Sequence, residues 1–338
     1  MSFESEYRKN TYYENMEKSK RLQRAVKSSA PPISSESDKR FAEKRRSSFE
    51  ANESPEDAFR AKALEALTVI RINQGAWFND PANNTYTAEA TATNDLDDIG
   101  NCTDVMVTVR TSEESPAQVD ADLPFGIDVT TTNDPDKITS KLLVSTNNPR
   151  INLPVGFTEL KYYKNLKGEI GSMVMPRYCI GIGSNHVDDI LEMTDIDPDN
   201  RVTLRGSDST VRFKILYEMS LQNQLFEAPL YHQEDSETIS DEHQKLLRQM
   251  EQLDAIYVTE LTKLAKKLPE YAIRGTNYDL QKIALNLQRG QFGDDGDETF
   301  RMICEQTEAI SSAVFDSDEP DEMLRQLSDD ARKAKRAT

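Results

Sequence analysis

The chain has 338 residues and a formal net charge of -18, with 37% hydrophobic, 7% aromatic and 30% charged residues. This length suits one large domain or two ordinary ones, and the mean hydropathy of -0.68 indicates that part of the chain is not packed in a core. No apolar stretch approaches the roughly 20 residues that span a bilayer, and no apolar signal segment opens the sequence, so we expect a soluble, cytoplasmic protein without membrane contact.

Cysteine and histidine usage restricts the metal chemistry. The three cysteines (Cys102, Cys179, Cys304) lie far apart and form no CxxC pair, which argues against a zinc site or a disulfide framework and fits a reducing compartment. Three histidines are too few for multi-histidine metal chemistry. Any metal is therefore expected to be held by oxygen ligands, which favours Mg²⁺ or Mn²⁺.

The charge is distributed unevenly along the chain. Residues 1–50 hold 12 basic and 8 acidic residues, whereas the remainder holds 29 basic and 51 acidic residues. An acidic body repels nucleic acid at long range, which counts against DNA binding. Because residues 1–50 are charged, rich in serine and almost free of Leu, Ile and Val, we expect a mostly disordered basic tail with a transient helix near Asn15–Val26.

The first clear element is a helix at about residues 55–72. Ser54 suits its N-cap, and apolar residues that include Phe59 recur on one face. Glu56 is three residues before Phe59, so we expect it on the inward face at the start of the helix. Glu65 is expected to point the opposite way.

Strands dominate the next part of the sequence. Residues 85–93 alternate and are rich in threonine, residues 94–101 form an acidic turn or loop, and two β-branched runs follow at 103–109 and 124–130. A helix is expected at 137–144 and another at 186–193, with strands between them at 158–163 and 176–183.

The last third of the sequence is helical in pattern, with helices expected at 240–267, 277–287 and 299–314. We therefore predict an α/β fold in which helices flank a mixed central sheet. Its parts would be a tail at 1–50, an α/β core at 54–233 and a helical region at 236–338.

Two of the expected strands each carry one acid among apolar residues, Asp104 in the first and Asp128 in the second. A carboxylate inside an apolar strand is costly to bury without a partner. Two such strands in succession therefore indicate either a shared cation or a matched base. The candidate bases are Lys137 and Lys141 in the following helix, and Lys161 in a later strand.

These residues suggest a metal site. Asp104 and Asp128 on neighbouring strands can share one or two hard divalent cations, and Glu56 would add a ligand from the helix. A nearby lysine, either Lys141 or Lys161, can orient an attacking water or neutralise charge that develops on a phosphate. Together they would support phosphodiester hydrolysis assisted by Mg²⁺ or Mn²⁺.

The order of these elements resembles the PD-(D/E)xK restriction-endonuclease-like superfamily over roughly residues 54–193. Asn101-Cys102-Thr103-Asp104 corresponds to the first acid, and Asp128 lies in the second acidic strand, Pro124-Phe125-Gly126-Ile127-Asp128-Val129-Thr130. The resemblance implies a mixed sheet flanked by helices and a metal-dependent nuclease.

The lysine departs from this pattern. The superfamily expects it two residues after the second acid, where this chain has Thr130. Some members place the lysine on the following helix, which would make it Lys141 or Lys137. In a second alignment, Glu159-Leu160-Lys161 is a literal ExK and Asp128 becomes the first acid. We prefer the first alignment because its two acids occupy successive strands after the acidic helix.

Two functions remain open at this point. The first is a Mg²⁺- or Mn²⁺-dependent nuclease that acts on DNA or RNA, with its basic tail tethering the substrate. The second is a non-catalytic interaction or scaffold protein on the same fold, which binds a protein partner through its acidic surface or its C-terminal helices. The position of the lysine relative to the two acids distinguishes these hypotheses.

Overall fold

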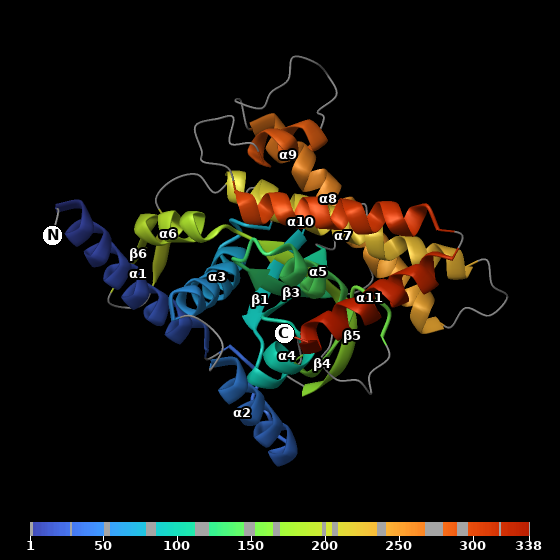
Figure 1. Cartoon of the computed structure of the whole chain (residues 1–338), viewed down its shortest axis with the longest axis horizontal. Coiled ribbons are helices and arrows are strands. Elements are labelled where there is room, and N and C mark those ends of the chain that lie inside the picture. The colour runs from blue at the N-terminus through green and yellow to red at the C-terminus, as the bar shows by residue number, and fades with distance from the viewer. Residues whose placement is uncertain are drawn as a thin grey trace.

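The structure is a computed structural model. It describes residues 3–27, 29–50, 55–78, 86–111, 122–144, 153–164, 170–197, 201–204, 209–234, 241–267, 280–288, 297–317 and 319–337. Within these ranges the chain folds as a mixed α/β structure in which helices surround a central sheet (Figure 1). The predicted fold class is confirmed.

The central sheet contains five strands in the order β1-β2-β3-β5-β4. β3 pairs with β2 in the antiparallel sense and with β5 in the parallel sense, so the sheet is mixed. The strands are β1 (Tyr86–Ala92), β2 (Val105–Thr111), β3 (Leu123–Thr130), β4 (Phe157–Lys164) and β5 (Ile170–Gly181). A two-stranded ribbon is formed by β6 (Thr194–Ile196) and β7 (Val202–Leu204).

The helices are spread over the whole chain and are longest after the sheet. They are α1 (Phe3–Lys27), α2 (Glu36–Glu50), α3 (Pro55–Asn73), α4 (Asp95–Asn101), α5 (Pro135–Leu143), α6 (Ser184–Met193), α7 (Ser209–Glu234), α8 (Asp241–Lys267), α9 (Leu280–Gln288), α10 (Glu298–Phe315) and α11 (Pro320–Ala337). None of the described helices is long and apolar enough to cross a membrane.

Successive residues of β3 face opposite sides of the sheet, and each side belongs to a different buried cluster. Ile127 and Val129 belong to the larger buried apolar cluster, where α3, α7 and α8 also contribute. Asp128, between them, has the opposite orientation because successive strand residues point to opposite faces. Cys179, its register partner on β5, belongs to the second cluster with α5, α10 and α11.

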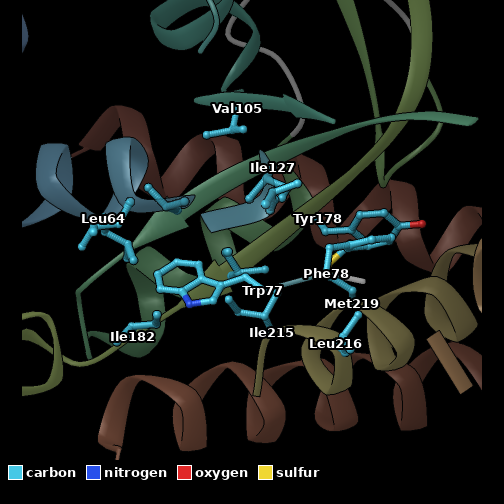
Figure 2. Packing of buried hydrophobic residues seen from close by; sticks show 14 of the residues in the cluster. Leu64, Trp77, Phe78, Val105, Ile127, Tyr178, Ile182, Ile215, Leu216 and Met219 are labelled. Atoms are coloured by element: carbon cyan, nitrogen blue, oxygen red, sulfur yellow. The ribbon is translucent and has the colours of Figure 1, made fainter. Parts of the chain in front are cut away.

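Aromatic rings fill the larger cluster. Trp77 and Phe78, which follow α3, are fully buried and pack beside Tyr178 and residues of α7 (Figure 2). The ring of Phe78 lies 5.5 Å from that of Phe125 and 6.0 Å from that of Tyr257, between centroids. This packing fixes the end of α3 against the sheet, and α3 carries part of the site described below.

The C-terminal helices pack on the α/β core. α8 lies along α7, and α10 contacts α7, α5 and β5. α11 covers α5, where the Ser328 hydroxyl donates to the Leu143 carbonyl at 3.0 Å. The apolar stripes of these helices are therefore buried by the protein's own sheet and helices.

Two segments differ from the sequence prediction. In place of a disordered tail, α1 and α2 lie over residues 3–27 and 36–50, with Leu22 of α1 fully buried and the Ser19 hydroxyl bonded to the Phe59 carbonyl. In place of an acidic loop, residues 95–101 form α4. Local composition does not predict these helices, because tertiary contacts with α3 and β4 stabilise them more than intrinsic helix preference does.

Candidate metal centre

α4 sets the position of the acid at the start of β2. The Asn94 side chain caps the helix, and Cys102 ends it in a left-handed conformation with a φ of 52°. The chain then turns into β2 at Asp104, whose amide donates to the Ile127 carbonyl at 2.9 Å. The Asp104 carboxylate accepts the Val129 amide at 2.7 Å, so it takes the place of a backbone carbonyl at the end of the ladder.

A buried carboxylate fixes α4 against β4. Asp97 accepts the Lys161 amide at 2.9 Å and side-chain amides from Asn94 and Asn101 at 2.8 Å. These bonds compensate for burying the acid, which the sequence predicted as part of a solvated loop. They also determine where the next residue, Asp98, points.

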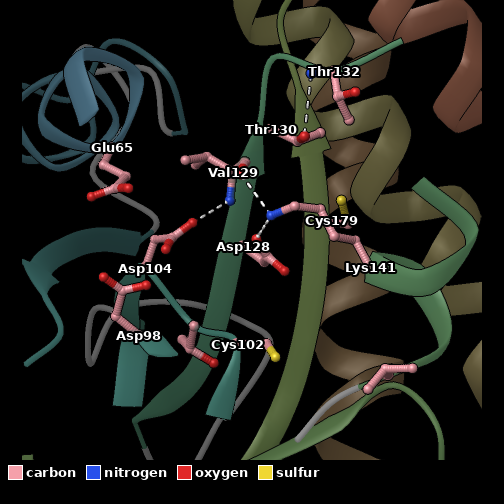
Figure 3. Close-up of polar contacts among 12 residues, drawn as sticks. Glu65, Asp98, Cys102, Asp104, Asp128, Val129, Thr130, Thr132, Lys141 and Cys179 are labelled. Atoms are coloured by element: carbon pink, nitrogen blue, oxygen red, sulfur yellow. Dashed lines mark hydrogen bonds and ion pairs between the residues drawn. The ribbon is translucent and has the colours of Figure 1, made fainter. Parts of the chain in front are cut away.

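Three carboxylates converge beside the start of β2. Glu65 from α3, Asp98 from α4 and Asp104 each offer an oxygen, and these oxygens lie within 4.8 Å of one another (Figure 3). All three side chains are half-buried. We call these three residues the acidic cluster.

One lysine contacts the acidic cluster directly. Lys62 lies one turn before Glu65 on α3, and its Nζ is 2.7 and 2.9 Å from the two Glu65 oxygens. The same Nζ is 3.1 Å from Asp98 Oδ2. Two of the three carboxylates, Glu65 and Asp98, therefore share one ammonium group, and the cluster together with Lys62 carries a formal charge of -2 when all four groups are ionised.

The protonation equilibria reflect this excess of negative charge. Burial raises the pKa of Glu65 to about 7, and Asp98 adds to the effect while Lys62 opposes it. Burial also raises the pKa of Asp104 well above its usual range, with further contributions from Glu65, Asp98 and Asp128. Burial alone would lower the pKa of Lys62, but the surrounding carboxylates outweigh it and raise that pKa. The cluster therefore binds protons tightly when no other cation is bound.

Asp128 has a different environment. It is buried on β3 and pairs with two cations, Lys141 from α5 and Arg177 from β5. The Arg177 Nη1 atom lies 2.9 Å from Asp128 Oδ2. The Lys141 ammonium also donates to the Val129 carbonyl at 3.1 Å (Figure 3). The charge of Asp128 is thus fully compensated by protein groups.

Arg177 connects the elements around Asp128. Besides the carboxylate, its guanidinium donates to the Lys141 carbonyl, and to the Val144 and Cys102 carbonyls at 3.4 Å. It therefore ties the end of α5 and the turn after α4 to the middle of the sheet. Its side chain is only 1% exposed.

The structure brings together some of the residues selected from the sequence. Asp104 and Asp128 are close enough for the charge of one to raise the pKa of the other, and Lys141 contacts Asp128. Lys161 does not join them, because it lies on the edge strand β4 and its ammonium pairs with Asp38 of α2 at 2.6 Å. The side chain of Glu56 lies outside the described residues.

The acid that α3 contributes to the cluster is Glu65, whereas the sequence pattern predicts that this side chain points away from the site. The expectation took the face of Phe59 as the only inward face, whereas most of α3 is buried. Lys62 and Asp98 were also missed, since an exposed-looking lysine and an acidic loop carry no pattern of their own. Arg177 could have been found, because a lone arginine inside an apolar strand needs a partner as much as a lone aspartate does.

Comparisons with protein-family models, curated proteins and solved structures find no match. Carboxylate oxygens are the ligands that Mg²⁺ and Mn²⁺ prefer. Among the described residues, Glu65, Asp98 and Asp104 could hold such an ion, and a divalent cation there would displace their protons and balance the charge that Lys62 does not.

Proposed function

We propose that this chain is a divalent-metal-dependent nuclease that hydrolyses phosphodiester bonds in DNA or RNA. The observation that carries the proposal is the acidic cluster, where oxygens of Glu65, Asp98 and Asp104 lie within 4.8 Å of one another and the Lys62 ammonium pairs with the first two. Mg²⁺ or Mn²⁺ held there would lower the pKa of a bound water and neutralise charge that develops on a phosphate.

The lysine beside Asp128 has a defined role in this proposal. Burial would lower the pKa of Lys141, but the charges of Asp128 and Asp104 outweigh it and raise that pKa. Lys141 therefore stays protonated at neutral pH and acts as a fixed positive charge and hydrogen-bond donor, not as a base. The Asp128 carboxylate and the Val129 carbonyl hold this ammonium, whose charge lowers the pKa of Asp104.

The order of the elements supports the same proposal. α3 supplies one acid, β2 begins after Asp104, β3 carries Asp128, and α5 supplies Lys141. This is the order that the resemblance to the PD-(D/E)xK superfamily implies, with the lysine on the helix instead of the strand. Thr130, which stands at the usual lysine position, is buried and accepts the Thr132 amide at 3.4 Å.

One observation favours the second candidate, a non-catalytic interaction protein on the same fold. Asp128 is compensated by Arg177 and Lys141 within the protein, as in a structural ion pair. The C-terminal helices offer less support, because α10 and α11 are packed against α5 and the core.

A cleavage assay separates the two candidates. Wild-type protein would be incubated with single- and double-stranded DNA and RNA in Mg²⁺, Mn²⁺ or EDTA, beside Asp104→Asn and Glu65→Gln variants. We expect metal-dependent cleavage that falls at least about 100-fold in both variants. Glu305→Gln is the matched control, since Glu305 lies on exposed α10 surface and pairs with Arg301.

Equal cleavage by wild type and both site variants would contradict the proposal and indicate a contaminating nuclease. Complete absence of cleavage on every substrate, together with an unchanged melting temperature in Mg²⁺ and Mn²⁺, would favour the interaction protein. An ion that binds the native state selectively must raise the melting temperature.

A further inference from the structure

We propose that Lys62 is an internal competitor for the metal, whose ammonium group occupies the acidic cluster until a divalent cation displaces it. This inference rests on the proposed function and concerns how the same site is regulated. It predicts that the free metal concentration at which the site fills is set by Lys62.

The contacts of Lys62 place it where the ion would bind. Its Nζ lies 2.7 and 2.9 Å from the Glu65 oxygens and 3.1 Å from Asp98 Oδ2. Mg²⁺ takes carboxylate oxygens at about 2.1 Å, so an ion bound to the same oxygens would lie within a few ångströms of the ammonium nitrogen. Two cations at that separation repel, and each competes for the same lone pairs.

Lys62 is also free to leave. Among the described residues, its ammonium group has no hydrogen bond or ion pair beyond those to Glu65 and Asp98. Its side chain is 42% exposed, and a four-carbon stem lets the charged end swing into solvent at little cost. Displacement therefore requires no movement of the backbone.

Lys141 is held differently, which makes Lys62 the displaceable cation of the site. Lys141 donates to both the Asp128 carboxylate and the Val129 carbonyl. Asp128 is bound in turn by Arg177, so removing Lys141 would disturb a buried network. Removing Lys62 disturbs only half-buried carboxylates, which the incoming cation then compensates.

The test compares Mn²⁺ binding by calorimetry at pH 8 in the wild type, Lys62→Gln and Lys62→Arg. Removing the competing charge in Lys62→Gln should tighten Mn²⁺ binding by roughly 10-fold, given the strength of close charge pairs at a partly exposed site. Lys62→Arg keeps the charge and should not bind Mn²⁺ more tightly than the wild type. Lys20→Gln is the matched control, because Lys20 also pairs with an acid three residues away, Glu17, and should leave Mn²⁺ binding unchanged.

The possible results distinguish this inference from the proposed function. Equal Mn²⁺ affinity in all four proteins, or tighter binding in Lys62→Arg that matches Lys62→Gln, would overturn the role of Lys62 and leave the metal site in place. No Mn²⁺ binding to any of the folded proteins would overturn the metal site itself, and the inference with it.

Discussion

Asp128 and Arg177 form an ion pair inside the sheet, with side chains 5% and 1% exposed. Charges this deeply buried remain stable only when each is compensated, and the cost of stranding one exceeds the net gain from the pair. Arg177 also satisfies backbone carbonyls at the end of α5 and after α4. Its loss should therefore destabilise the fold as well as displace Lys141.

Replacing Arg177 tests how much these contacts stabilise the fold. We expect Arg177→Met to lower the free energy of unfolding by about 3 kcal/mol, because Asp128 loses the more deeply buried of its two cationic partners. Urea unfolding measures the change. The control Arg301→Met removes an exposed arginine that pairs with Glu298 and Glu305, and should change stability by less than about 0.5 kcal/mol. Equal effects of the two substitutions would show that the contacts of Arg177 with Asp128 and the backbone carbonyls contribute nothing to stability.

A half-buried acid on α7, Glu227, makes stability depend on pH. Burial raises the pKa of Glu227 to about 7, with Asp254 adding to it, while its Oε1 accepts the Asn223 amide at 2.7 Å. A raised carboxyl pKa means that the folded state binds the proton more tightly than the unfolded state. The unfolding free energy therefore falls as pH rises from about 4.5 to about 7.

Glu227→Gln removes this titration and keeps a hydrogen-bond acceptor for Asn223. At pH 8 the variant should be about 1 to 2 kcal/mol more stable than the wild type, and at pH 4 the difference should vanish. Denaturant unfolding at the two pH values checks this. The same difference at both values would mean that Glu227 does not titrate in this range.

Only some of the residues in the site were predictable from the sequence. Asp104 and Asp128 were predictable because an acid between β-branched residues is anomalous by itself. Glu65 and Asp98 were not, since each lies in a locally ordinary helical or acidic stretch and gains its place from the docking of α3 and α4. Tertiary packing, which no local pattern encodes, completes the cluster.

At the scale of elements, β5 and α10 approach closely at a glycine. A Cβ on Gly181 would lie 2.4 Å from Ile303 Cδ1 and 2.6 Å from Thr299 Cγ2, both on α10. At Gly171, near the other end of the same strand, a Cβ would meet nothing within 4 Å. The close approach of α10 to β5 at this point therefore requires a residue without a side chain at position 181.

These two glycines form a matched test. Gly181→Ala should destabilise the protein by about 1 to 3 kcal/mol through overpacking against α10, whereas Gly171→Ala should be neutral to slightly stabilising. Thermal unfolding of the two variants measures the difference. Similar melting temperatures would show that α10 does not pack on β5 in this way.

Most elements with a regular spacing of apolar residues, or with a clear capping residue, were predictable from the sequence. The strands of the sheet, α5 with its Asp134 cap, and the long α8 fall close to their expected positions. α4 was missed because a seven-residue segment with only two large apolar residues, Leu96 and Ile99, is too short to show a helical period. It depends on Asp97, whose carboxylate binds amides of β4.

At the scale of the whole molecule, the first helix is part of the folded body. α1 packs on α3 and α6, and Leu22 is fully buried there. Leu22→Ala should therefore cost about 2 to 4 kcal/mol of stability, measured by urea unfolding. Leu285→Ala, on the exposed side of α9, is the control and should cost less than about 1 kcal/mol. If Leu22→Ala left the unfolding free energy unchanged, residues 3–27 would not pack on the folded body, and the disordered tail that composition predicts would be supported.

The acidic body has a consequence for the proposed nuclease. Its charge opposes the approach of nucleic acid, so affinity must come from local compensation at the site. A divalent ion in the acidic cluster supplies that compensation where a phosphate would bind. The metal is thus central to both substrate binding and hydrolysis in the proposed function.

Crystals soaked in Mn²⁺ provide the most direct test, through the anomalous scattering of the ion. We predict a peak within about 2.3 Å of oxygens from Glu65 and Asp104, with the Lys62 ammonium moved away from it. The peak should disappear in Asp104→Asn crystals. Density that still shows Lys62 between Glu65 and Asp98, with no anomalous peak at the acidic cluster, would contradict the metal site and the nuclease function proposed from it.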